Sequence, residues 1–355
     1  MKGAIAVPEY SVYNSPNTDS SPKSDDTIHV ALAVYDPSGT YSQHAGVVMA
    51  SIFENTHSKV TVHILHDDTL TDDNRRKFIR TAEKYSQTVE FHDVTDYMKR
   101  IGKDIAEFLK NNFTIGALFR LTIQDIILFD KVIYLDCDII VCLDIRELWE
   151  IDIKDYYVAA VPDTNSWRKS HYSSWRVKCF LNGCDSYSYV NSGVMLINLA
   201  EIRKKYADLF STSIQWLREH LHNASCPDQD AYNSIFRNAI KLIDKRFNSM
   251  SGANLSEKIE GIIIHSNGGN RVWEMSGKPY QVLYWKTYIH SAWGESSNGE
   301  ELIEAVSRYT KLNEERRLFS RNIRKIFDTV PETLSILKLI LKNWYYRLKY
   351  KLTHR

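Results

Sequence analysis

The sequence has no long hydrophobic run and almost no net charge. No stretch of about eighteen consecutive apolar residues occurs in the 355-residue chain, so we expect no membrane-spanning helix. Pro8, Glu9 and Tyr10 follow directly on MKGAIAV, too early for the hydrophobic region of a secretory signal peptide, and we expect none. The formal net charge of +1 gives no general attraction to nucleic acid, so we expect no nucleic-acid partner.

Cysteine is also scarce. The five cysteines are an odd number, and Cys137 and Cys142 stand in an apolar run, a pattern typical of reduced, buried thiols in a cytoplasmic protein. Cys179 and Cys184 have a spacing that zinc sites can use. Because no second pair of ligands accompanies them at such a spacing, we do not expect zinc there.

The remaining composition is that of a folded protein with an unevenly charged end. Hydrophobic residues make up 43% of the chain and charged residues 25%, which is ordinary for a globular protein with a sizeable core. Residues 311–355 hold twelve Lys and Arg against four Asp and Glu. Ser, Asp, Asn and Pro dominate the second half of residues 1–27 and predict a disordered leader. We therefore expect this leader, a catalytic domain over residues 28–275 and a helical C-terminal region over residues 276–355.

Strand-like and helix-like stretches alternate along the main domain. The patterns predict strands over residues 28–34, 59–65, 88–94, 131–144, 156–163, 188–199 and 261–265, and helices over residues 42–56, 71–86, 117–128, 201–221 and 227–238. Strands that alternate with helices favour an α/β fold, with a mostly parallel, doubly wound sheet flanked by helices.

Two carboxylates interrupt one predicted strand. The run KVIYLDCDIIVCLD (residues 131–144) is largely apolar, yet Asp136 and Asp138 stand inside it, close to the end where open α/β sheets bind ligands. Residues two apart on an extended chain point to the same side, so these negative charges repel unless a cation lies between them. A divalent cation would serve, and could stabilise a diphosphate leaving group. The alternative is that both acids cap turns or pair with arginines, since Asp-x-Asp is a common sequence.

Four motifs together indicate a family. VIYLDCDIIV, YVNSGVMLINL, PDQDAYN and IIIHSNGG occur in one order with characteristic spacing. Over residues 28–275 the chain resembles the GT-A-fold retaining glycosyltransferases that include bacterial lipopolysaccharide galactosyl- and glucosyltransferases and glycogenin. The resemblance implies a GT-A (Rossmann-like) domain. It also implies Mn²⁺-dependent transfer of glucose or galactose from a UDP-sugar, with retention of the α-configuration.

The resemblance assigns ligands for the metal and the donor. Asp136 and Asp138 match the family's Asp-x-Asp, which binds Mn²⁺ and the donor diphosphate, and His265 matches the third protein ligand. Imidazole and carboxylates suit Mn²⁺ better than Mg²⁺, the other candidate. Arg120, in LFRLTI, matches an arginine that contacts the donor. Without the family, His265 is an ordinary turn residue and Arg120 a partner in a surface ion pair.

The resemblance also assigns residues around the transferred sugar. Asn191 matches the Asn of an Asn-[Ala/Ser]-Gly-Val motif whose amide approaches the donor sugar, and Gly193 leaves room beside the backbone. Asp228, Gln229 and Asp230 match Asp-Gln-Asp, in which the first acid holds sugar hydroxyls and the glutamine lies near the anomeric carbon. These four polar residues are the predicted catalytic set. Alternatively, PDQD is simply a helix start, with a proline and with acids that suit the helix dipole.

Two departures from the family pattern concern the donor. In HSNGGNRVW, Gly268 and Trp273 fit, but Arg271 stands where the family often has a lysine on the diphosphate; arginine can bind phosphate through its planar fork. In the first strand, AVYDPSGTY replaces the family's A-A-D-x-x-Y, and Asp36 is the candidate for the aspartate that reads uracil. We predict that Asp36, Gly268 and Arg271 help to bind UDP.

The expected function is therefore retaining hexosyl transfer to a glycan, lipid-linked or glycoprotein acceptor, in bacterial surface-glycan or glycoprotein assembly. One alternative is a sugar nucleotidyltransferase, which would need a glycine-rich phosphate loop that YDPSGT does not supply. The other is a non-catalytic glycan-binding protein on the same fold, which would have no need of Asp136, Asp138 and His265.

The basic C-terminal end carries a further prediction. LSILKLILKNWYYRLKYK (residues 334–351) places apolar side chains at helical spacing on one face, with lysines away from it. Trp and Tyr favour the headgroup level, and each basic residue near an anionic surface contributes about 1 kcal/mol. We predict a cytoplasmic protein that is peripherally associated with the inner face of the cell membrane. The alternative is a helix packed on the catalytic domain.

Overall fold

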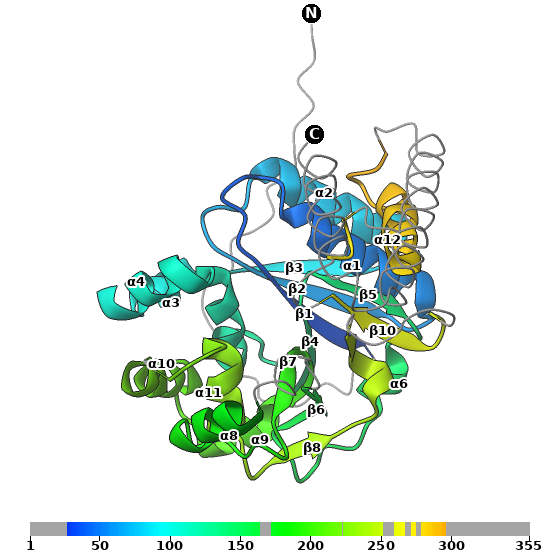
Figure 1. Ribbon diagram of the computed structural model, residues 1–355. Helices are drawn as coiled ribbons and strands as arrows, with labels where there is room; N and C mark the ends of the chain where they lie inside the picture. The colour runs from blue at the N-terminus through cyan, green and yellow to red at the C-terminus, as the bar shows by residue number, and fades with distance from the viewer. Residues whose placement is uncertain are drawn as a thin grey trace, which may run out of the picture.

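The computed structural model describes residues 27–163, 172–221, 223–250, 259–266, 271–274 and 278–295 (Figure 1). The predicted disordered leader, Gly268 and the basic tail over residues 334–351 lie outside the described residues, apart from Thr27.

The described residues form the predicted α/β fold. The strands are β1 (Ile28–Val34), β2 (Val60–His66), β3 (Thr88–Asp93), β4 (Lys131–Leu135), β5 (Ile139–Cys142), β6 (Val158–Pro162), β7 (Val190–Asn198), β8 (Ile240–Leu242), β9 (Ser249–Met250) and β10 (Ile262–His265). The helices are α1 (Ser42–Asn55), α2 (Asp72–Lys84), α3 (Thr95–Lys99), α4 (Lys103–Asn112), α5 (Ile123–Ile126), α6 (Arg146–Trp149), α8 (Tyr172–Leu181), α9 (Leu199–Lys205), α10 (Leu209–His220), α11 (Pro227–Ile235) and α12 (Pro279–His290), with 3₁₀ helices η1 (Ile115–Thr122) and η2 (Lys245–Asn248).

Two sheets organise the domain. The larger has seven strands in the order β3-β2-β1-β4-β7-β6-β8, and the smaller has the order β5-β10-β9. Pairing in the larger sheet is parallel except at β7, which runs antiparallel to both β4 and β6. The prediction of a mostly parallel sheet is confirmed. Strands such as β1 are apolar along nearly their whole length because helices cover both faces.

The two faces of the larger sheet have separate cores. Figure 1 shows α1, α2 and α12 on one side, and α10 and α11 on the other. Val48 of α1 and Phe78 of α2 belong to the first core, whereas Phe210 of α10 and Tyr232 of α11 belong to the second. Helix α2 begins directly after Thr71, whose side chain accepts a hydrogen bond from the Asn74 amide at 3.2 Å.

Three predicted elements differ from those observed. The strand expected over residues 131–144 is two strands, β4 and β5, which belong to different sheets. The helix expected over residues 201–221 is divided into α9 and α10, because Asp208 starts a new helix by accepting a hydrogen bond from the Ser211 amide at 2.7 Å. The helix expected over residues 117–128 is divided into the 3₁₀ helix η1 and the short α-helix α5.

The described part of the predicted C-terminal region packs on the main domain. In α12, the Tyr284 hydroxyl lies 2.7 Å from Nδ1 of His44 in α1. Trp293 lies against Gly46, where an added Cβ would be 2.2 Å from the Trp293 ring, so only glycine allows this approach. Trp293 therefore belongs to the first core, whereas Tyr280 and Tyr284 form a smaller cluster with Val47 of α1. Among the described residues, no helix is both long and apolar enough to cross a membrane.

Candidate donor and metal site

The two acids of the interrupted strand and a distant histidine come together. Asp136 and Asp138 lie in the turn between β4 and β5. Strand β5 pairs antiparallel with β10, with His265 opposite Ile139, and this register carries the histidine to the turn. His265 Nε2 lies 3.2 Å from Asp138 Oδ1 and 3.8 Å from Asp136 Oδ2. We name these three residues the Asp–Asp–His cluster.

The Asp–Asp–His cluster fits a divalent metal ion. Its three ligand atoms lie close enough together to share one ion, and Asp138 and His265 are buried. Two carboxylates and one imidazole are a donor set suited to Mn²⁺. Gly193 of β7 lies directly against the site. A Cβ added there would be 2.2 Å from His265 Cε1 and 2.7 Å from Asp136 Oδ2, so any larger residue would collide with these side chains. The expectation that Gly193 leaves room at the site is therefore confirmed.

A hydrogen-bonded chain fixes which nitrogen His265 presents. The Asn191 side-chain oxygen accepts the Gly193 amide at 3.0 Å and the Asn248 side-chain amide at 2.8 Å. The Asn248 oxygen must then accept from His265 Nδ1, which lies 2.9 Å away. Nε2 is left facing the acids, as a metal ligand requires. Asn248, in η2, was not predicted from the sequence.

Arg120 links the acids of two different elements. Its guanidinium lies 2.7 Å from Asp136 Oδ1 and 3.0 Å from Asp228 Oδ2, and it donates to the Ser192 carbonyl at 2.9 Å. It is almost fully buried beneath the site. The sequence alternative of a surface ion pair is therefore wrong. Tyr134 adds a hydroxyl 2.9 Å from Asp136 Oδ1.

The predicted Asp-Gln-Asp motif lies at the first turn of α11. Gln229 Oε1 accepts the Ser192 amide at 3.0 Å and the Asn191 side-chain amide at 3.2 Å, and Gln229 Nε2 donates to Asp163 at 2.9 Å. Asp163 and Ser192 are further neighbours that sequence reasoning missed. Asp230 accepts the amides of the loop before the helix, at Ser225 and Cys226, and bonds Tyr189.

Asp36 and Arg271 occupy different surroundings. The Asp36 carboxylate accepts the Tyr41 amide at 2.7 Å and the Ser42 amide and hydroxyl at 2.9 and 2.6 Å, and is 1% exposed. It thereby holds the loop before α1, and base reading by Asp36 stays a prediction. Arg271 forms an ion pair with Asp138, so this arginine does lie beside the Asp–Asp–His cluster.

Opposite charges control protonation in the site. Burial raises the pKa of Asp138, but the charge and hydrogen bond of His265, with Arg271, outweigh burial and lower it. Burial lowers the pKa of His265, but Asp138 and Asp136 outweigh it, and the net direction is upward. Burial raises the pKa of Asp228, and Arg120 opposes that change. Each acid of the Asp–Asp–His cluster therefore lies beside His265 and one arginine, Arg120 for Asp136 and Arg271 for Asp138.

The fold and this site define a glycosyltransferase of the GT-A type. Residues 33–277 match the family model described as glycosyl transferase family 8. The chain therefore belongs to glycosyltransferase family 8, as the motif order predicted.

Known proteins of this kind are similar over most of the chain. A putative glycosyltransferase of Haemophilus influenzae is 30% identical over 244 residues, 66% of this chain and 70% of that protein. The lipopolysaccharide 1,3-galactosyltransferase of Salmonella typhimurium is 24% identical over 70% of this chain and 74% of its own length. The crystal structure of the galactosyltransferase LgtC with donor and acceptor sugar analogs shares the fold with a TM-score of 0.60 and 22% identity, covering 87% of this chain and 99% of that one.

The contact at Gly193 can be tested by one methyl group. In Gly193→Ala, the added Cβ must displace His265 or Asp136, so we expect Mn²⁺ affinity to fall at least tenfold, about 1.4 kcal/mol, while the protein stays folded. Isothermal titration with Mn²⁺ measures the affinity, and circular dichroism measures the fold. Met195→Leu, in the same strand, is the control. Unchanged Mn²⁺ affinity in Gly193→Ala would contradict this placement of the ligands.

Proposed function

We propose that the protein is a Mn²⁺-dependent retaining hexosyltransferase that moves glucose or galactose from a UDP-sugar to a glycan, lipid-linked or glycoprotein acceptor. The observation that carries this proposal is the Asp–Asp–His cluster at the carboxyl end of β4, within a family 8 chain. The glucosyl- and galactosyltransferase names of its lipopolysaccharide relatives support the choice of sugar. Bacterial surface-glycan or glycoprotein assembly is the proposed setting.

The residues around the cluster suit binding of a sugar diphosphate. Asp136, Asp138 and His265 would hold the ion, which when bound neutralises the charge that develops on the departing diphosphate. Arg271 can exchange its contact with Asp138 for a phosphate oxygen, since a guanidinium pairs with either anion in the same planar geometry. Arg120 keeps Asp136 and Asp228 at fixed positions by pairing with both.

The residues at the start of α11 suit binding of the hexose. Asp228 provides a buried carboxylate for sugar hydroxyls, as the family resemblance implies. Gln229 is held at both ends of its amide by Ser192 and Asp163, so its position is fixed before the donor arrives. An amide oxygen carries no formal charge and is a poor nucleophile. We therefore favour attack by the acceptor on the face from which UDP departs, with a diphosphate oxygen taking the acceptor proton and Gln229 positioning the sugar.

This mechanism makes a prediction for Gln229. In Gln229→Ala, kcat should fall, because the sugar is less well positioned, but transfer should remain measurable because no covalent step is lost. Steady-state kinetics with UDP-glucose and UDP-galactose measure the change. A glycosyl-enzyme adduct trapped on Gln229 or Asp230 of the wild-type protein, and seen by mass spectrometry, would contradict front-face attack.

Metal dependence of UDP binding tests the donor site itself. EDTA should weaken UDP binding by the wild-type protein at least tenfold, and Asp138→Asn should bind UDP weakly whether or not Mn²⁺ is present. Isothermal titration with UDP measures both effects. Asp155→Asn, which changes an exposed acid, is the matched control. Wild-type UDP affinity that EDTA leaves unchanged would contradict the proposed metal site.

Peripheral attachment to the cytoplasmic face of the membrane is the second part of the proposal. It rests on the sequence of residues 334–351, where basic and aromatic side chains occur together. Deleting residues 334–355 should abolish sedimentation with anionic liposomes, because the basic residues that attract the surface are removed, while UDP-sugar hydrolysis is retained. Full-length protein that never sediments with these liposomes would exclude a membrane role for this segment.

A further inference from the structure

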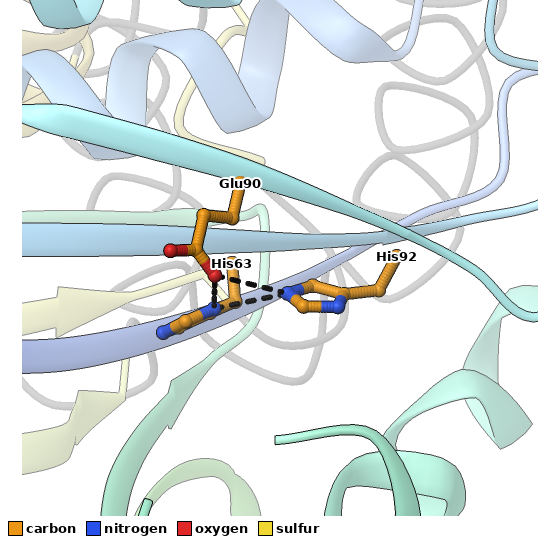
Figure 2. A group of neighbouring side chains, drawn as sticks. All are labelled: His63, Glu90 and His92. Atoms are coloured by element: carbon orange, nitrogen blue, oxygen red, sulfur yellow. Dashed lines mark hydrogen bonds and ion pairs between the residues drawn. The ribbon is translucent and has the colours of Figure 1, made fainter. Parts of the chain in front are cut away.

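A second group of metal-ligating side chains lies on other strands of the large sheet. Figure 2 shows His63 of β2 facing Glu90 and His92 of β3. His63 and Glu90 are opposite each other in the parallel pairing, and His92 lies two residues further along β3, so the three side chains share one face of the sheet. The Asp–Asp–His cluster, by contrast, lies in the turn after β4 and at the last residue of β10.

We propose that His63, Glu90 and His92 form a second metal site, which binds a divalent transition-metal ion of the borderline class, with Zn²⁺ the best fit. Two imidazoles and one carboxylate are a donor set that zinc sites with three protein ligands use, with water in the fourth position. We name these residues the β2–β3 cluster.

The distances between the ligand atoms support this choice of metal. Nδ1 of His63 lies 3.0 Å from Nε2 of His92 and 3.3 Å from Oε2 of Glu90, and the latter two atoms are 3.8 Å apart. Zinc–ligand distances near 2.0–2.1 Å give a tetrahedron with edges of about 3.3–3.4 Å. The three atoms thus already form a triangle close to one face of that tetrahedron, and shifts of a few tenths of an ångström would complete it.

The β2–β3 cluster has both a buried and an accessible side. His63 is buried, whereas His92 is only partly buried. Glu90, with 48% of its side chain exposed, leaves the site open to solvent.

His29 of β1 contacts His63 from behind the β2–β3 cluster and orients its ring. The other ring nitrogen of His63, Nε2, lies 2.9 Å from Nδ1 of His29 in β1. With a metal ion on Nδ1, Nε2 of His63 carries its proton and donates to His29, the type of outer contact that fixes a ligating histidine. Phe129 stacks on the His29 ring with centroids 3.5 Å apart.

The position of the β2–β3 cluster gives the ion a structural role. β3 is at the edge of the seven-stranded sheet and pairs only with β2 in the order of that sheet. One ion bound by both strands would cross-link this edge strand to the rest of the sheet. Binding to the folded state alone then raises the melting temperature, by an amount that increases with ion concentration.

The experiment separates this site from the Asp–Asp–His cluster. Full-length Asp138→Asn protein, in which the first site is disabled, is titrated with Zn²⁺ in competition with a chromophoric chelator. We expect one Zn²⁺ per chain, a higher melting temperature with Zn²⁺, and the visible absorption of four-coordinate Co²⁺ when cobalt replaces zinc. Adding His92→Ala should lower the Zn²⁺ affinity at least tenfold and remove the cobalt bands.

Two further variants on the Asp138→Asn background guard against effects on folding. Glu90→Gln keeps the size of a half-exposed side chain, and should also lower the affinity at least tenfold. His57→Ala removes an exposed histidine elsewhere and should change nothing. No stoichiometric Zn²⁺ in Asp138→Asn, or equal affinity with and without Glu90→Gln, would overturn the proposal and leave the three side chains as a hydrogen-bonded chain sharing a proton.

Discussion

The architecture of the site depends on one electrostatic constraint: three carboxylates share a largely buried space and need positive charge. Asp136 and Asp138 come from the turn after β4, and Asp228 comes from α11. Arg120 pairs with Asp136 and Asp228. His265 lies beside Asp136 and Asp138. Removing one partner of such a group leaves an uncompensated buried charge, which typically costs about 3–5 kcal/mol. Elements far apart in the sequence are therefore tied to one another through the site.

This constraint also explains why the site suits a metal ion and an anionic donor. Arg120 is buried and pairs with both Asp136 and Asp228, whereas Arg271 pairs with Asp138 and has 42% of its side chain exposed. A divalent ion between the two aspartates would allow Arg271 to turn to phosphate. The same residues would then stabilise the ligand-free protein and bind the donor.

The sequence predicted the residues of the Asp–Asp–His cluster better than the residues that support them. Asp136, Asp138 and His265 occur in motifs with a recognisable order, and the structure brings them together. Asn248 was missed because RFNSM has no pattern of its own, and its role arises only when η2 packs beside β10. The division of residues 131–144 into two strands was missed because an apolar run does not reveal that its halves join different sheets. The β2–β3 cluster needed the strand register, which spacing alone does not supply.

Turnover with candidate donors tests the central claim of metal-dependent hexosyl transfer most directly. UDP-glucose, UDP-galactose and other nucleotide sugars are each incubated with the full-length protein, and released UDP is measured with Mn²⁺ and with EDTA. The account predicts UDP release from UDP-glucose or UDP-galactose that requires Mn²⁺ and exceeds release from the other donors. Absence of release from both hexose donors, or release that EDTA does not reduce, would contradict it.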